Sequence, residues 1–346
     1  MNDGRLRRFL GIVAFACGIT GASCSTIGAT PLGPVRDARI DAAVRFVMDD
    51  PKIAGLALGI ARASHIVAIR TYGYADRASR RRVDARTVFP IGSLTKSFTA
   101  AMLRMLVLEG RVAPDAALRR YVPEYRAAGA VTIDELLAQT GGIPDYAQGV
   151  GFLASSALPL APESLIARAA AQPLGPSGTF EYANTNYLLA AVIAQRAAGV
   201  SYAALLRRSI LDPLRLERTA VANAFAAPVD RARGDASEGS ATLGFGCADL
   251  ESDVPDLLAW SGALFAGRVV PAPRAIGPYD DGFFLATTLG RRVAYASGYV
   301  PGFSSYLLVV PDADLRVVLL SNAGNVDLGP LARSVAAAAL DLRETD

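Results

Sequence analysis

The spacing of apolar residues divides the chain into two kinds of segment. Near the N-terminal end, residues 55–61 and 66–72 form two short apolar runs around a polar turn, which is typical of paired strands. Similar runs recur near the C-terminal end, at residues 282–288, 292–296, 304–310 and 315–321. Between the two groups, apolar residues recur at helical intervals. The pattern therefore predicts strands at both ends of the chain and helices in the middle.

Helical spacing is found in eight segments, at residues 37–48, 93–109, 133–138, 162–172, 186–198, 202–210, 252–265 and 329–342. The first and last of these flank the two groups of strands. We therefore predict an α+β fold in which one antiparallel sheet is flanked by terminal helices, with an all-helical subdomain inserted between the strand groups. The sheet part would cover about 35–90 and 240–346, and the helical part about 91–239, within a single catalytic domain of residues 30–346.

The first 29 residues have a different pattern. Three arginines precede the apolar run 9–19, and small residues follow, which is the layout of a secretory signal and is too short for a comfortable membrane span. We expect residues 1–29 to be a signal peptide and the protein to be exported to a periplasm or the extracellular space. Cys24 is a candidate lipid anchor, although Gly21 stands where an aliphatic residue is usual, so a membrane-anchored lipoprotein is an alternative.

Charge and composition limit the partners. The net charge of +3 falls by 2 to +1 when the three arginines and one aspartate of the signal are removed, so nothing indicates binding to nucleic acid or to an anionic membrane. Cleavage after Ala29 would leave Cys247 as the only cysteine of the remaining sequence, without an intramolecular disulfide partner. The single histidine, His65, argues against histidine metal sites, and no Walker loop or dinucleotide fingerprint occurs. We expect no cofactor and no metal.

Ser93 and Lys96 form a Ser-x-x-Lys pattern at the start of an apolar helix. The two side chains lie on the same helix face. A serine hydroxyl needs a neighbouring base, and a lysine can be that base when it is neutral, which burial in an apolar site favours. Backbone N–H groups at the helix start can help to stabilise an oxyanion. The alternative is a short pattern that arose by chance, with Ser93 as a helix cap.

Two observations favour chemistry over chance. Lys52 and Lys96 are the only lysines in a chain that is rich in arginine, and Lys96 stands in an apolar helix, where an unneeded charge is costly. A Ser-His-Asp triad would require His65, which falls in a predicted surface turn far along the chain from Ser93.

Two further patterns lie downstream. The segment from Phe180 to Tyr187 contains Tyr182, whose phenol could relay a proton, and Asn184, whose amide could hold a substrate ester or amide. The segment from Tyr295 to Phe303 lies at a strand end, where a backbone N–H could supply a second oxyanion donor and the strand edge could pair with an extended substrate. Each segment taken alone is better explained by an ordinary loop or strand end.

Taken together and in this order, the three patterns resemble the serine beta-lactamase and penicillin-binding-protein superfamily, and within it the class C branch with D-alanyl-D-alanine carboxypeptidases and related esterases. The likeness runs from about Gly55 to Ala323. It includes Gly-Tyr-Ala-Asp at 73–76, Phe-Pro-Ile-Gly-Ser-Leu-Thr-Lys-Ser-Phe-Thr-Ala at 89–100, Leu-Glu-Gly at 108–110, Tyr-Ala-Asn-Thr-Asn-Tyr at 182–187 and Pro-Gly-Phe-Ser-Ser at 301–305.

The resemblance implies a beta-lactamase/transpeptidase-like fold and a set of site residues. Ser93 would be the acylated nucleophile and Lys96 its base, while Tyr182 would relay the proton and Asn184 would contact the substrate amide. On the third strand, Ser297 and Gly298 of the triplet Ala296-Ser297-Gly298 and the following Tyr299 would bind substrate. The backbone N–H groups of Ser93 and Tyr299 would form the oxyanion hole.

The sequence departs from the family pattern in two places. Ala296 stands where the family has lysine or histidine, so a substrate carboxylate would lose a charged hydrogen bond of about 1.5–3 kcal/mol. Ala138-Gln-Thr-Gly-Gly142 stands where the family often has Thr-His-Thr-Ser-Gly, and here we expect a structural role because Gln139 can close the loop.

The sequence thus favours an exported serine hydrolase that forms an acyl-enzyme on a small ester, amide or peptide, with an ester or small amide preferred over a beta-lactam because of Ala296. The alternative is a non-catalytic, penicillin-binding-like sensor or binding protein with a degraded third motif. The natural substrate, the oligomeric state and the signal cleavage site do not follow from the sequence.

Overall fold

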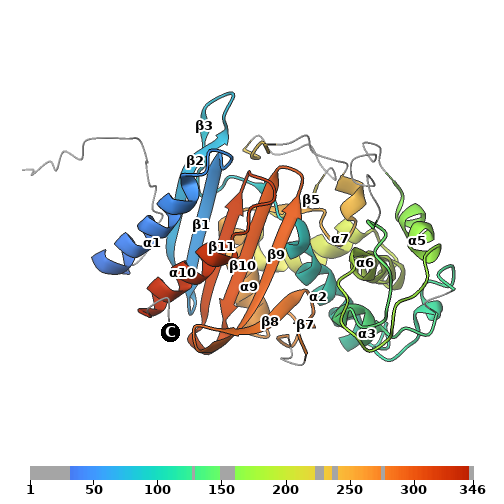
Figure 1. Ribbon diagram of the computed structural model, residues 1–346. Helices are drawn as coiled ribbons and strands as arrows, with labels where there is room; N and C mark the ends of the chain where they lie inside the picture. The colour runs from blue at the N-terminus through green and yellow to red at the C-terminus, as the bar shows by residue number, and fades with distance from the viewer. Residues whose placement is uncertain are drawn as a thin grey trace, which may run out of the picture.

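The computed structural model describes residues 32–126, 129–148, 160–222, 230–235, 241–273 and 277–342. Its main element is an antiparallel sheet in the order β3-β2-β1-β11-β10-β9-β8-β7 (Figure 1). The strands are β1 (Gly55–Arg62), β2 (His65–Asp76), β3 (Arg81–Arg82), β7 (Tyr279–Asp280), β8 (Phe283–Thr288), β9 (Arg291–Val300), β10 (Phe303–Val310) and β11 (Leu315–Ser321). The two strand groups of the sequence therefore join in one sheet, with β1 paired to β11 at its centre.

Each face of the sheet has its own apolar core. Along β11, Leu315, Val317 and Leu319 pack with the terminal helices α1 (Pro34–Met48) and α10 (Gly329–Leu340). These two helices lie together across one face of the sheet (Figure 1). The alternate residues Val318 and Leu320 belong to the larger core on the opposite face, as the two-residue period of a strand requires.

The larger core holds α9 and the helical part. Helix α9 (Val254–Phe265) packs directly on the sheet: a Cβ on Gly59 of β1 would lie 2.2 Å from Val254 Cγ1, so only glycine allows this approach. The helices of the middle part are α2 (Thr95–Leu108), α3 (Ile133–Ala138), α5 (Pro162–Ala170), α6 (Asn184–Ala198), α7 (Tyr202–Leu206) and α8 (Asp212–Leu214), with a π-helical turn η3 (Arg207–Leu211) between the last two.

The short 3₁₀ turns are η1 (Gly92–Leu94), η2 (Leu118–Arg120), η4 (Ala241–Gly244) and η5 (Pro311–Ala313). A small second sheet has the order β4-β6-β5 and consists of β4 (Phe89–Pro90), β6 (Leu250–Ser252) and β5 (Ala220–Val221). It connects the chain that enters η1 to the chain that enters α9.

The predicted fold class is confirmed. The predicted helices and strands are present and differ from prediction at their ends, whereas five short strands were not predicted. The helix expected from Ser93 begins as η1 and becomes α-helical at Thr95. The helix expected from residue 252 begins at Val254, because β6 continues to Ser252 and the Asp253 carboxylate caps the helix. Strands β3 to β7 were not predicted, since two or three residues carry no periodicity. The expected signal at residues 1–29 and Cys24 lie outside the described residues.

Within the described ranges, no single helix has both the length and the hydrophobicity to cross a membrane. Among the described residues, one bent pair of helices, Asn184–Ala198 with Tyr202–Leu214, has the required length and hydrophobicity when the two are taken together. Most apolar residues of this pair belong to the larger core.

Candidate active site

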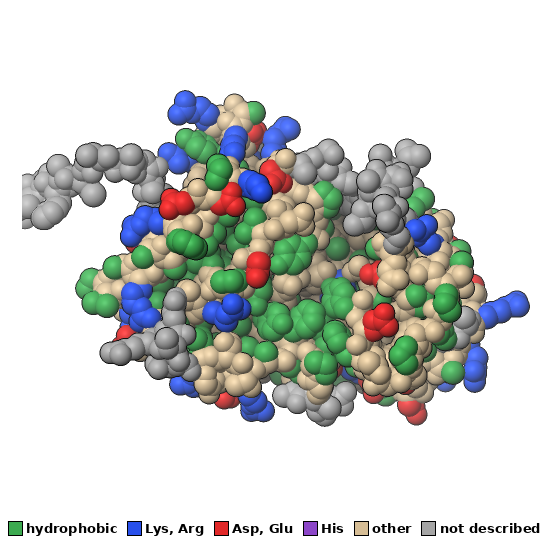
Figure 2. All heavy atoms as spheres, in the orientation of Figure 1, with side chains coloured by type: hydrophobic (Ala, Val, Ile, Leu, Met, Phe, Trp, Pro, Cys, Tyr) green, Lys and Arg blue, Asp and Glu red, His purple; other side chains and the backbone are tan. Residues whose placement is uncertain are grey.

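Ser93 lines a cavity of about 360 Å³ between the sheet and the helical part. The residues that line this cavity come from β4, η1, α6, η4, β6, β8, β9 and β10 and from connecting segments that include Tyr146, Arg231 and Cys247. On the face in Figure 2, hydrophobic side chains gather where β8 and β9 meet the helical part. The cavity wall is mainly apolar, and this limits the chemistry of what can bind.

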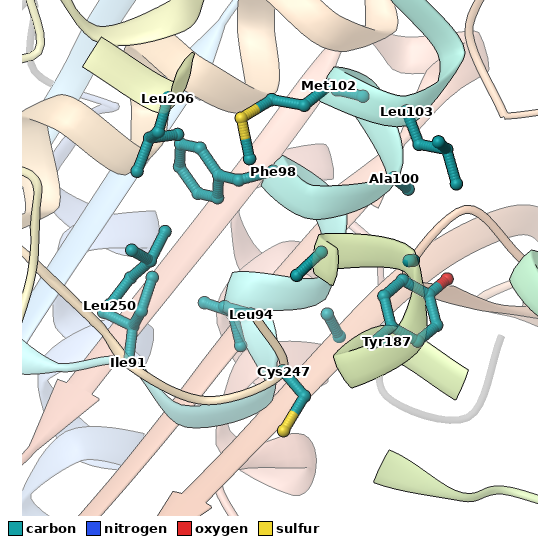
Figure 3. Packing of buried hydrophobic residues seen from close by; sticks show 14 of the residues in the cluster. Ile91, Leu94, Phe98, Ala100, Met102, Leu103, Tyr187, Leu206, Cys247 and Leu250 are labelled. Atoms are coloured by element: carbon teal, nitrogen blue, oxygen red, sulfur yellow. The ribbon is translucent and has the colours of Figure 1, made fainter. Parts of the chain in front are cut away.

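The turn that carries Ser93 is held rigidly. Gly92 has φ +51°, a left-handed conformation that favours glycine. The following helix α2 is fixed on several sides: Ser97 Oγ accepts from Trp260 Nε1 at 3.0 Å and donates to Leu94 O, and the rings of Phe98 and Trp260 stack 4.1 Å apart. Figure 3 shows the apolar side chains of this helix and of its neighbours in the core. Ser93 thus lies on a turn that leads directly into a largely buried helix.

Lys96 lies beneath Ser93 with its side chain fully buried. Its Nζ donates to Ser93 Oγ at 2.9 Å, to Asn184 Oδ1 at 2.8 Å and to the carbonyl oxygen of Cys247 at 3.0 Å. The ring centroid of Tyr182 lies 4.9 Å from the same nitrogen. The first two sequence patterns therefore meet at one ammonium group, although 88 residues separate Lys96 from Asn184.

The second pattern enters the site as an extended segment followed by a helix. Ala183 is extended, and Asn184 is the first residue of α6, two residues earlier than predicted. Gln139 Oε1 accepts from the Ala183 N–H at 2.6 Å, so Gln139 fixes the backbone between Tyr182 and Asn184. Gln139 itself is a left-handed helix cap of α3. The structural role expected for Gln139 is what the structure shows.

The third pattern runs along the other side of η1. A Cβ on Gly298 would lie 2.1 Å from Ile91 O, and a Cβ on Gly92 would lie 2.8 Å from the Tyr299 nitrogen. Ser305 Oγ on β10 also donates to Ile91 O at 2.7 Å. These contacts bring the Tyr299 amide next to the turn of Ser93, and Ser297 and Tyr299 both line the cavity.

Ala296 does not line the cavity with them. Its side chain is 3% exposed and belongs to the larger core. The position that holds lysine or histidine in the family pattern is therefore occupied here by the small, buried, apolar side chain of Ala296.

The far wall of the cavity contains aromatic rings and one charged group. Tyr182 stacks on Phe284 with centroids 5.8 Å apart. Among the described residues that line the cavity, Arg231 is the only charged side chain, and its Nε donates to Glu251 Oε2 at 2.7 Å. The guanidinium carbon also lies 5.5 Å from the Phe303 ring centroid. This positive charge is balanced by a buried carboxylate.

Sequence reasoning missed several residues of the site. Asp145 Oδ2 accepts from Asn184 Nδ2 at 3.0 Å, which orients the amide so that its oxygen faces Lys96. Cys247 contributes through its backbone carbonyl, which leaves no signature in a sequence. Asp249, two residues after the carbonyl that Lys96 contacts, was interpreted as a solvated acid before a helix but is 3% exposed. Position after a turn was the only available signal for Asp145.

The remaining chemical candidates lie elsewhere. His65 is exposed at the start of β2, with its ring next to Ser64, as expected for a surface histidine. In the ranges that the structure describes, no group of three or more histidine, cysteine or acidic side chains could hold a metal ion.

A serine hydroxyl in contact with a buried lysine, on a helix between an antiparallel sheet and a helical part, defines the class of serine hydrolases in which lysine takes the place of histidine. Comparison with known proteins agrees. The chain belongs to the family described as Beta-lactamase, whose model matches residues 40–340.

Its relatives include several serine hydrolases. The chain is 27% identical over 296 residues to a D-aminopeptidase of Cereibacter sphaeroides, a match that covers 76% of this chain and 56% of that protein. It is 34% identical over 159 residues to penicillin-binding protein 4* of Bacillus subtilis, which covers 44% of this chain and 35% of the relative. The chain thus spans about half the length, or less, of these curated relatives.

Solved structures agree on the fold. The octameric penicillin-binding protein homologue of Pyrococcus abyssi has a TM-score of 0.79 at 24% identity and covers 90% of this chain and 78% of its own. The D-amino acid amidase of Ochrobactrum anthropi SV3, in complex with L-phenylalanine amide, has a TM-score of 0.77 at 22% identity and covers 89% and 98%.

Proposed function

We propose that this protein is an exported serine hydrolase that forms an acyl-enzyme on Ser93, with Lys96 as the base. The observation that carries the proposal is the 2.9 Å contact between Lys96 Nζ and Ser93 Oγ inside an apolar site. Export rests on the signal-like residues 1–29.

The reaction has two halves. Ser93 Oγ attacks the substrate carbonyl carbon while neutral Lys96 takes the hydroxyl proton, and the backbone N–H groups of Ser93 and Tyr299 receive the negative charge on the carbonyl oxygen. The carbon–leaving-group bond then breaks, and Tyr182 passes a proton to the departing alcohol or amine. Water attacks the ester on Ser93, which releases the acid and restores the serine.

The residues in the walls of the cavity favour a small ester or amide as the substrate, without a carboxylate near the scissile bond. Ala296 offers no cation, and Arg231 already pairs with Glu251. The aromatic surface around Tyr182 and Phe284 suits an apolar acyl group. The names of the relatives, a D-aminopeptidase and a D-amino acid amidase, support an amide as well as an ester.

The first test is to label Ser93. The purified protein lacking residues 1–29 is treated with a fluorophosphonate and, separately, with a fluorescent penicillin, and adducts are located by mass spectrometry. We expect a stable fluorophosphonate adduct on Ser93, little penicillin adduct, and no adduct in Ser93→Ala.

Turnover separates an enzyme from a sensor. A p-nitrophenyl ester of an apolar acid should be hydrolysed in repeated cycles by the parent protein and not by Ser93→Ala. Folded protein without any adduct on Ser93 would refute the hydrolase, whereas an acyl adduct that never turns over would favour the penicillin-binding-like sensor.

A further inference from the structure

The loop that carries Asp145 is bound to the first turn of α6. Thr185 Oγ1 donates to Pro144 O at 2.7 Å and accepts from the Tyr146 N–H at 2.8 Å. The residues on both sides of Asp145 are therefore held by the residue that follows Asn184. Thr185 and Tyr146 are both buried. The two segments thus keep a fixed register, in which the Asp145 carboxylate lies against the Asn184 amide.

Both oxygens of the Asp145 carboxylate accept a hydrogen bond. Oδ2 accepts from Asn184 Nδ2 at 3.0 Å, and Oδ1 accepts from the Ala147 N–H at 3.0 Å within the same loop. The backbone carbonyl of Asp145 accepts from the Gln148 N–H at 3.1 Å and from Gln172 Nε2 at 3.3 Å. The carboxylate is therefore fixed by its own loop, and a fixed acceptor can orient the amide that it contacts.

The Asn184 amide lies between two groups of opposite character. Its Oδ1 accepts from Lys96 Nζ at 2.8 Å, while its Nδ2 donates to Asp145. An ammonium group only donates and a carboxylate only accepts. The reverse orientation of the amide would place donor against donor at the lysine and acceptor against acceptor at the aspartate. The amide is therefore oriented from both sides.

The two partners of the amide behave differently in the proposed reaction. A lysine that acts as a base has a lone pair on its nitrogen, so it can accept a hydrogen bond as well as donate one. In that form Lys96 would tolerate a reversed Asn184, whose N–H could then occupy the lone pair that Ser93 needs. The Asp145 carboxylate still only accepts, so it keeps the amide oxygen on the lysine in both forms.

We propose that Asp145 is a positioning residue, which holds the Asn184 amide oxygen on Lys96 and so keeps the lysine nitrogen available to the nucleophile. Asn184 lines the cavity and Asp145 does not, so Asp145 acts through the amide and touches no substrate. An amide nitrogen has two N–H groups, so one remains for a substrate carbonyl oxygen while the other is on Asp145. The inference rests on the proposed function, because it assumes that Lys96 accepts a proton from Ser93.

Removing the carboxylate should slow the reaction although no group that touches the substrate is lost. In Asp145→Ala, and in Asp145→Leu, which keeps a similar size but has no acceptor, kcat/KM for a p-nitrophenyl ester should fall by about 10–100-fold. A small displacement of a catalytic group is enough for such a loss. In the Asn184→Ala background, the same substitution should cost less than about threefold, because the amide through which Asp145 acts is absent.

Gln172→Ala is the matched control, because it removes a hydrogen bond to the backbone of Asp145 and leaves the bond to Asn184 in place. Its kcat/KM should equal that of the parent protein. Thermal melting confirms that each variant folds. A loop that only supported the fold would lower kcat/KM by the same factor with and without the Asn184 amide, so the comparison of the two backgrounds distinguishes positioning from general stability.

The outcomes separate this inference from the proposed function. A parent protein that shows neither ester turnover nor fluorophosphonate labelling of Ser93 would refute the hydrolase, and the role of Asp145 with it. A parent-like kcat/KM in a folded Asp145 variant, or an equal loss with and without the Asn184 amide, would overturn the role of Asp145 and leave the hydrolase intact.

Discussion

At the scale of single residues, Lys96 is the most constrained group in the site. An ammonium group has three N–H donors, and here all three are used, on Ser93, Asn184 and Cys247. The nitrogen also lies close to the faces of the Tyr182 and Tyr187 rings. Because the side chain is fully buried, these contacts hold its nitrogen against Ser93 Oγ, which is the arrangement that the proposed proton transfer needs.

Replacing this lysine should remove the reactivity of the serine. In Lys96→Ala, and in Lys96→Met, which keeps the length of the chain, fluorophosphonate labelling of Ser93 should fall by about 10²–10⁴-fold because no base remains in contact with the hydroxyl. Lys52→Ala is the control, since the other lysine is exposed. Labelling at the parent rate in either Lys96 variant would exclude lysine as the base.

At the scale of elements, the site depends on how closely β9 approaches η1. The strand and the turn touch backbone to backbone, because Gly92 and Gly298 have no side chain between them. This approach brings the Tyr299 amide beside the turn of Ser93, where the proposed reaction needs a second oxyanion donor. In the proposed mechanism, the geometry of the oxyanion hole therefore depends on these two glycines, neither of which carries a reactive group.

Gly298→Ala should separate these two elements. Its Cβ would lie 2.1 Å from Ile91 O and 2.3 Å from Ser305 Oγ, so β9 must shift. A displacement of about 1 Å can cost about 100-fold in rate, and we expect a loss of that order in ester hydrolysis, measured as kcat/KM. The matched control is Gly262→Ala in α9, whose Cβ would lie 3.6 Å from its nearest neighbour atom, Arg316 Cζ. Equal activity in both variants would contradict this account.

The sequence predicted the elements better than their junctions. Long periodic segments such as β10, β11 and α10 were located to within one or two residues. Their buried faces require apolar residues at a regular spacing, which can be seen in the sequence. Four residues that the structure brings together could be predicted because side chains of these types can carry chemistry: Ser93, Lys96, Tyr182 and Asn184. Cys247 and Asp249 were missed, since a backbone carbonyl has no sequence signal and the burial of an acid depends on contacts across the fold.

At the scale of the whole molecule, buried aspartates link stability to pH. Burial raises the pKa of both Asp249 and Asp253 to about 7 and also raises that of Asp256. Between pH 4 and pH 7, the folded protein therefore binds more protons at these sites than the unfolded chain does. The free energy of unfolding must then decrease as the pH rises through this window.

The melting temperature should accordingly be higher at pH 5 than at pH 8. Measurements above pH 5 avoid the opposite effect of acids whose pKa is lowered, such as Glu124, which are ionised in both states there. In the double variant Asp249→Asn with Asp253→Asn, the melting temperature should change less between the two pH values, as followed by circular dichroism. A melting temperature that rises from pH 5 to pH 8 in the parent protein would show that these carboxyl groups are ionised in the folded state.

The pairing of β1 with β11 also has a consequence for the order of folding. Ser321 Oγ donates to Gly55 O across 266 residues of sequence, so the centre of the sheet joins its first strand to its last. Contacts of such long separation form slowly, and the hairpin of β1 and β2 keeps one edge unpaired until β11 pairs with it. Since β9 and β10, which lie next to the turn of Ser93, also come late in the sequence, the proposed site can form only after these strands have joined the sheet.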